Sequence, residues 1–236
     1  MARARSRLSG VCLALASAFA AFMPLAAAAQ ASTETFDTSA GNLLVVLRES
    51  RGENKQDETL EPYGRIKVRL ENGRDVEFVT SWYQYLGDMH VRIVFDGPQN
   101  LQSAAPEDLE RLRLTPEEAL EVGIANLRRV YGSPTVKPWT GGLMQVEGGA
   151  PDLASSYFLD RKFWAGLQRQ HPDGIVAAVP RRGGLVFAPM SDRAALATLQ
   201  FSAAALYAGG PGTRLSSALY LFKDGRWSVF QPPQAH

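Results

Sequence analysis

Two adjacent arginines are the residues of this sequence best suited to hold an anion. Arg181 and Arg182 stand between Pro180 and the pair Gly183 and Gly184, where two apolar runs meet. Guanidinium groups bind carboxylates and phosphates through paired N–H donors, and proline and glycine favour a tight turn. The pattern therefore predicts either a binding site for an anionic ligand or a solvated turn between two strands.

Aromatic residues and one aspartate are the other candidates. Trp82, Tyr83 and Tyr85 follow a predicted strand, and Trp227 lies in a C-terminal hairpin, so these rings either stack on a ligand or belong to the core. Asp160 either acts as a general acid or base or caps the helix that follows it. Capping is the simpler interpretation, because the residues after Asp160 have a helical pattern.

Common catalytic and cofactor motifs are absent from the sequence. No Gly-x-Ser-x-Gly pattern occurs, and residues 209–212, Gly-Gly-Pro-Gly, lack the lysine of a phosphate-binding loop. The histidines His90, His171 and His236 have no metal-ligand spacing. We therefore expect no cofactor and no metal.

Apolar runs predict the elements that position these residues. Residues 175–179 and 185–188 are apolar at every position, which is typical of central strands covered on both faces. Residues 155–159 are predicted as a further buried strand. About three helices are predicted: one opening at Thr115 and Pro116, one after Asp160, and one after Ser191 or Asp192.

Two hairpins have a register that can be argued from their turns. A three-residue loop at residues 71–73 would pair Val68 with Val76. A two-residue loop at residues 224–225 would pair Phe222 with Trp227. Hairpins joined by helices predict an α+β fold with a largely antiparallel sheet, with a β-rich region at residues 32–112 and an α+β domain at residues 113–236.

The first 31 residues predict a secretory signal peptide. A start with three arginines precedes an apolar stretch, and Ala29-Gln30-Ala31 fits the small-residue cleavage rule, with Ala27-Ala28-Ala29 as the alternative. Cleavage after Ala31 would remove the single cysteine and lower Lys plus Arg from 25 to 22 against 24 acids, for a net charge of −2. This charge does not favour nucleic-acid binding, and no second membrane-length segment follows, so the mature chain is expected in the periplasm or medium.

Short segments in the second half of the chain form an ordered pattern. They are SYFLD at 156–160, FW at 163–164, VAAVPRR at 176–182, LVF at 185–187, LS at 215–216, LY at 219–220 and DGRW at 224–227. The pattern resembles the YtpQ-like family, a domain of unknown function. Gly183 stands where the family pattern has an acid, and family members are often cytoplasmic, unlike a chain with an export signal. The resemblance implies a fold and no assigned activity.

Three classes of function follow from these observations. The first is a non-catalytic exported module that binds an envelope protein or an anionic ligand, and the absence of a catalytic constellation favours it. The second is a hydrolase or transferase whose site combines scattered acids with Arg181 or Arg182. The third is a small-ligand carrier with an aromatic pocket lined by Trp82, Tyr85 or Trp227.

Export with cleavage after Ala31 is the first testable prediction. Intact-mass measurement of the protein recovered from the periplasm or medium should give a chain beginning at Ser32, because the signal peptidase reads the Ala-Gln-Ala site. Recovery of a chain that retains Met1 would contradict it.

Overall fold

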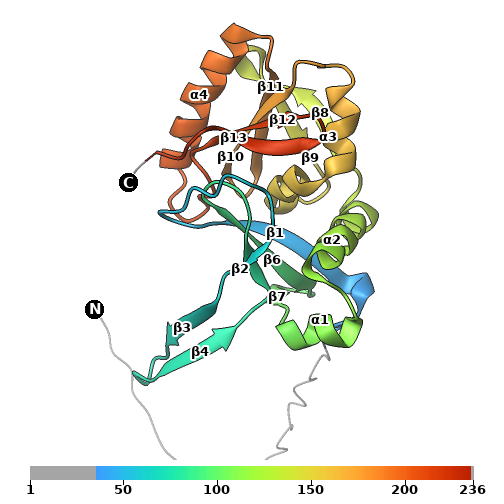
Figure 1. Cartoon of the computed structure of the whole chain (residues 1–236), viewed down its shortest axis with the longest axis vertical. Helices are drawn as coiled ribbons and strands as arrows, with labels where there is room; N and C mark the ends of the chain where they lie inside the picture. Colours follow the sequence, from blue (N-terminus) through green and yellow to red (C-terminus); the bar gives the residue numbers. More distant parts are fainter. Residues whose placement is uncertain (1–35, 235–236) are drawn as a thin grey trace, which may run out of the picture. The chain divides into compact units, whose positions relative to one another are not determined.

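The computed structural model describes residues 36–234, which form two antiparallel sheets, a separate hairpin and the helices around them (Figure 1). The predicted cleavage site after Ala31 lies outside these residues. The predicted α+β class and antiparallel strand pairing are confirmed, but the strands form two sheets and a separate hairpin where one sheet was expected, and the expectation of about three helices is wrong. The described residues contain four α-helices: α1 (Pro106–Leu112), α2 (Pro116–Tyr131), α3 (Arg161–Gln168) and α4 (Arg193–Ala208).

The larger sheet has the strand order β13-β12-β10-β11-β9-β8. Its central strands β10 and β11 are buried along nearly their whole length, as their uninterrupted apolar sequence predicts. Val176 and Ala178 pack under α4 on one face, whereas Ala177 and Val179 enter the main core on the other. The strands are β8 (Thr135–Pro138), β9 (Met144–Glu147), β10 (Ile175–Arg181), β11 (Gly184–Pro189), β12 (Leu219–Lys223) and β13 (Arg226–Gln231).

The smaller sheet has the order β1-β6-β5-β2, with β7 also paired to β6. Helix α2 lies against β1, and Gly123 permits the close approach because a Cβ there would stand 2.8 Å from Cγ1 of Val45. Asn126 of the same helix donates to the carbonyl of Leu43 at 3.0 Å, which fixes the helix along the strand. The strands are β1 (Leu43–Glu49), β2 (Glu61–Pro62), β5 (Trp82–Gln84), β6 (Met89–Asp96) and β7 (Leu101–Ser103).

A cluster of aromatic side chains fills the space between α3 and the larger sheet. Trp164 is fully buried, and its ring centroid lies 5.0 Å from Trp227 and 5.6 Å from Phe187. Its indole Nε1 donates to the carbonyl of Tyr157 at 2.9 Å, so the polar atom of this large ring is satisfied inside the core.

The segment before α3 is a helix rather than the predicted strand. Residues 155–159 form the end of the 3₁₀ helix η3 (Pro151–Leu159), and they are buried as expected. A short apolar run has the same pattern in a buried strand and in a buried helical turn, so burial could be predicted whereas the backbone conformation could not. Two other 3₁₀ helices are η1 (Ala40–Asn42) and η2 (Thr140–Gly142).

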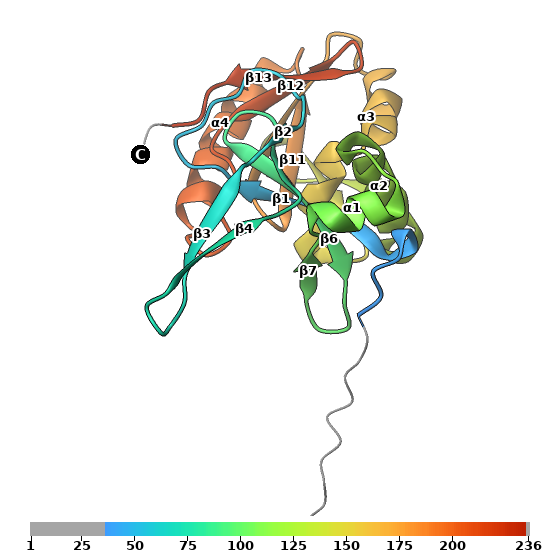
Figure 2. The same cartoon turned by 60° about the horizontal axis from the view of Figure 1, so that its bottom comes forward.

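Both hairpin predictions are confirmed. In the hairpin of β3 (Arg65–Arg69) and β4 (Asp75–Val79), Val68 pairs with Val76, and Gly73 has the positive φ that the loop requires. In the β12–β13 hairpin, Phe222 pairs with Trp227. The β3–β4 hairpin extends away from both sheets in the two views (Figure 2). Among residues 36–234, no helix combines the length and apolar character needed to cross a membrane.

Replacement of Trp164 by alanine should lower the free energy of unfolding by about 3–5 kcal/mol, because it empties a fully buried site and removes an internal hydrogen bond. Phe201 is the control, since its side chain is 79% exposed on α4 and its replacement by alanine should change stability by no more than about 0.5 kcal/mol. Urea denaturation of both variants compares the two effects. Equal losses would contradict this description of the core.

Candidate functional site

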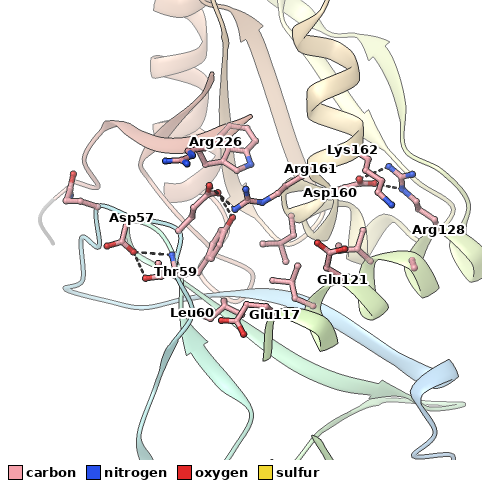
Figure 3. Close-up of a pocket in the computed structure, with 18 residues that line it drawn as sticks. Asp57, Thr59, Leu60, Glu117, Glu121, Arg128, Asp160, Arg161, Lys162 and Arg226 are labelled. Atoms are coloured by element: carbon pink, nitrogen blue, oxygen red, sulfur yellow. Dashed lines mark hydrogen bonds and ion pairs between the residues drawn. The ribbon is translucent and has the colours of Figure 1, made fainter. Parts of the chain in front are cut away.

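A pocket of about 740 Å³ opens between the loop before β2, helix α2, the start of α3 and the β12–β13 hairpin (Figure 3). The volume is in the range of sites that hold small organic ligands. Its lining consists of residues 56–60 of the loop, Tyr85, residues Glu117, Leu120, Glu121, Ile124, Ala125 and Arg128 of α2, Leu159 to Lys162, and Arg226 and Trp227.

The floor of the pocket is apolar and aromatic. Tyr85 and Trp227 are buried beneath it, and Leu120 and Ile124 face it from α2. The indole Nε1 of Trp227 donates to the carbonyl of Phe158 at 3.1 Å, which holds the ring in place. A ligand would therefore meet a preformed apolar surface rather than a flexible one.

Glu58 is the most enclosed carboxylate on the loop side of the pocket. It accepts from the hydroxyl of Tyr85 at 3.2 Å and pairs with Arg161 at 2.8 Å. Burial and the neighbouring Glu58 raise the pKa of the Tyr85 hydroxyl, so this group stays protonated and donates. The three side chains link the loop to the start of α3.

Asp160 has the capping role that the sequence predicts. Its carboxylate accepts from the backbone N–H of Phe163 at 3.1 Å and also binds the guanidinium of Arg128 at 2.5 and 2.6 Å. The side chain of Asp160 is almost completely buried, whereas that of Arg128 is 31% exposed, so the pair lies at the edge of the pocket. This pair joins α2 to α3 and forms one wall of the pocket.

Four charged side chains of the pocket have no ion pair or hydrogen bond to another described residue. Glu117 and Glu121 are one helical turn apart on α2, and Arg226 lies across the space from them (Figure 3). Lys162, at the start of α3, is the fourth. The pocket thus carries unpaired charges of both signs around an apolar floor.

The predicted arginine pair lies outside this pocket. Arg181 is exposed at the end of β10, whereas Arg182 is only partly exposed, and its Nε is buried without a hydrogen-bond partner among the described residues. The backbone of Arg182 is fixed, since its N–H donates to Thr213 and its carbonyl accepts from Ser155. Of the predicted binding residues, the pocket therefore contains Tyr85 and Trp227 but neither arginine, and Trp82 and Tyr83 lie outside it.

Arg182 belongs instead to a group of three arginines that we call the arginine cluster: Arg48, Arg92 and Arg182. Burial lowers the pKa of Arg48 to about 10, and the charges of Arg182 and Arg92 contribute. Burial also lowers the pKa of Arg92 to about 10, with Arg182 the next cause. Sequence reasoning missed Arg48 and Arg92, because only the pairing of β1 with β6 and the packing of the two sheets bring these distant residues together.

His90 lies beside the cluster and is buried. Its Nε2 accepts from Nε of Arg92 at 2.9 Å, so its proton is on Nδ1, which contacts the hydroxyl of Ser50 at 2.9 Å. Burial, followed by the charges of Arg92 and Arg48, lowers the pKa of His90 to about 3. The imidazole is therefore neutral near pH 7 and adds no further positive charge.

No assembled catalytic group is found in the described part of the pocket. Apart from Tyr85, its hydroxyl side chain is Thr59, which donates to Asp57. Lys55 and Thr59 lower the pKa of Asp57 to about 2, so Asp57 does not serve as a proton donor near neutral pH. Among residues 36–234, no group of three or more His, Cys, Asp or Glu side chains is placed to hold a metal ion. The arrangement is suited to binding an amphipathic, charged molecule.

Comparisons with known proteins add no relative. No family model, no curated protein and no solved structure matches the chain. The resemblance to the YtpQ-like family therefore stays a prediction.

His90 should make the protein sensitive to acid. Its pKa falls from 6.5 in the unfolded chain to about 3 in the folded one. Below pH 6.5 the unfolded chain therefore binds a proton that the folded chain does not, and the free energy of unfolding decreases. As the pH falls from 6.5 towards 3, each unit should remove up to about 1.4 kcal/mol of stability. Asp88 acts in the opposite direction, because burial raises its pKa, but it is present in wild type and variant alike.

The measurement is the free energy of unfolding of wild type and of His90→Gln between pH 7.5 and 4. The advantage of the wild type over the variant should shrink as the pH falls. A difference that is constant over this range would show that His90 does not titrate as described.

Proposed function

We propose that the mature chain is an exported, non-catalytic binding protein whose ligand occupies the pocket between α2, α3 and the β12–β13 hairpin. Among the predicted classes of function, the small-ligand carrier with an aromatic pocket fits the site best. The observation that carries this proposal is the apolar floor over Tyr85 and Trp227 with unpaired charges of both signs around it.

The distribution of charge indicates the class of ligand. Glu117 and Glu121 repel each other on α2 and would be stabilised by a cationic group on the ligand. Arg226 on the opposite side would bind an anionic group (Figure 3). A molecule with an ammonium group, an apolar middle and a carboxylate would match the glutamates, the apolar floor and Arg226 in turn. A short peptide with apolar side chains is the simplest example.

The hydrolase or transferase alternative has less support from the site. Its proposed constellation needs acids beside Arg181 or Arg182, and neither arginine lines the pocket. Glu58 and Asp160 are held in ion pairs with Arg161 and Arg128, which gives both carboxylates a structural role. Ligand binding without a reaction does not require either carboxylate to leave its ion pair.

Ala125 offers a direct test, because it is exposed on α2 and lines the pocket. Isothermal titration calorimetry with zwitterionic tripeptides that have an apolar central residue should detect binding to wild type. Ala125→Trp should weaken it at least tenfold by filling the pocket. Ala205→Trp is the matched control, since Ala205 is an exposed alanine inside α4, away from the pocket, and should leave affinity unchanged.

A second arm tests the assignment of the charges. Acetylation of the peptide amine should weaken binding about tenfold in wild type and much less in the double variant Glu117→Gln, Glu121→Gln, because the lost partner is already absent. Likewise, amidation of the peptide carboxylate should weaken binding about tenfold in wild type and much less in Arg226→Gln. Absence of binding by every peptide, or equal affinity in Ala125→Trp and wild type, would refute the proposed function.

A further inference from the structure

The arginine cluster is assembled by the register of the smaller sheet. Arg48 of β1 lies opposite His90 of β6, and Arg92 follows two residues later on the same face. On β5, Trp82 lies opposite Arg92. Arg182 comes to the group from the turn between β10 and β11 of the larger sheet. Its carbonyl accepts from the N–H of Ser155 in η3, and η3 packs against β1, the strand that carries Arg48. The charge of Arg182 acts on both Arg48 and Arg92.

The positive charge of the cluster is not balanced by the protein. In residues 36–234, no carboxylate lies within ion-pair distance of Arg48, Arg92 or Arg182. Glu49 is next to Arg48 in sequence, but strand alternation directs it to the opposite face, where it pairs with Arg51 and accepts from Tyr207. Three partly buried cations therefore lie near one another without an anion between them, and the charge of Arg182 helps to lower the pKa of both Arg48 and Arg92.

Several N–H donors of the cluster are also unused. The side chain of Arg182 makes no hydrogen bond to another described residue, and its Nε is buried from solvent. Arg48 donates from Nη1 to the carbonyl of Leu47 at 2.7 Å, and its other donors have no partner in the described chain. A buried guanidinium N–H without an acceptor is unfavourable, and an ordinary structural site would supply one.

Arg92 is held rigidly towards this site. Its Nε donates to His90, and its guanidinium carbon lies 3.4 Å from the ring centroid of Trp82. Tyr63 packs on His90 with the ring centroids 4.7 Å apart. The neutral imidazole and two aromatic rings thus orient one arginine without contributing a counter-charge.

We propose that the arginine cluster is a binding site for a phosphate-class oxyanion. A dianion with several acceptor oxygens matches three guanidinium groups better than a single carboxylate, because it offsets more charge and accepts more N–H donors. The site is separate from the pocket and shares none of its lining residues. The proposal therefore does not depend on the function proposed for the pocket.

The test uses inorganic phosphate and the mature protein. At about a hundredfold excess over its dissociation constant, phosphate should raise the melting temperature by on the order of 5 °C more than sodium chloride at equal ionic strength. Arg182→Met should abolish this increment. Arg181→Met is the matched control, because the neighbouring arginine is exposed and outside the cluster, and it should keep the full increment.

Charge reversal separates anion binding from a purely structural role. Arg182→Glu would supply the missing negative charge, so the melting temperature without phosphate should rise while the phosphate increment disappears. If Arg182 merely supports the fold, this variant should melt lower, and phosphate should still stabilise it. That result, or a phosphate effect no larger than that of chloride, would overturn the proposal.

Two further probes identify the source of the phosphate group. Glycerol phosphate represents soluble phosphate esters, and vesicles of phosphatidylglycerol represent lipid headgroups, with phosphatidylcholine vesicles as the control. Binding of either probe that is lost in Arg182→Met and kept in Arg181→Met supports the site and names its source. Binding of both probes that is unchanged in Arg182→Met contradicts it.

Discussion

Burial of both faces of the β10–β11 pair is the constraint on which the rest of the structure depends. Helix α4 must cover one face, and η3 with Trp164 must cover the other, since either face left open would expose a continuous apolar surface. The second requirement sets where α3 begins and hence where Asp160 and Arg161 stand. The turn between the same two strands carries Arg182 to the smaller sheet, so one central hairpin positions residues of both sites.

The pocket and the arginine cluster differ in how their buried charges are paired. In the pocket, the enclosed carboxylates Glu58 and Asp160 each have an arginine partner, and the unpaired charges are those nearest to water. In the arginine cluster, the groups are partly buried and all of one sign. Charges interact more strongly where water is excluded, so a cluster of like charges costs stability that pairing would have avoided. Groups with strongly perturbed charges are concentrated at functional sites, which is the reason for assigning a ligand to this cluster.

The sequence predicted local structure better than it predicted the sites. The cap at Asp160, the helix start at Thr115 and Pro116 and both hairpin registers depend on a few neighbouring residues, and each appears as expected. The segment at residues 155–159 failed because a buried apolar run has no periodicity that separates a strand from a helical turn. Helix α1 was missed because its seven residues carry only one fully buried side chain.

Neither site could be assembled from sequence, for a related reason. Arg182 was singled out by its turn, but its partners Arg48 and Arg92 come from strands whose pairing is set by the packing of both sheets. The pocket joins a loop, two helices and a hairpin, and its members have ordinary local roles such as helix surface or strand end. Residue types indicated which side chains could bind an anion or an aromatic ligand, whereas long-range contacts determine which of these side chains lie together.

The β3–β4 hairpin offers a place to attach a reporter. Its register is set by its own loop and by cross-strand ion pairs such as Arg69 with Asp75, so an insertion at the loop around Asn72 leaves the two sheets intact. The chain runs from the pocket loop at residues 56–60 through β2 and Tyr63 into this hairpin. A fluorophore at the tip would thus be near both binding regions along the chain, since the loop at residues 56–60 lines the pocket and Tyr63 packs on His90 beside the arginine cluster. It would still stand clear of both sites in space (Figure 2), so the label itself would not block a ligand.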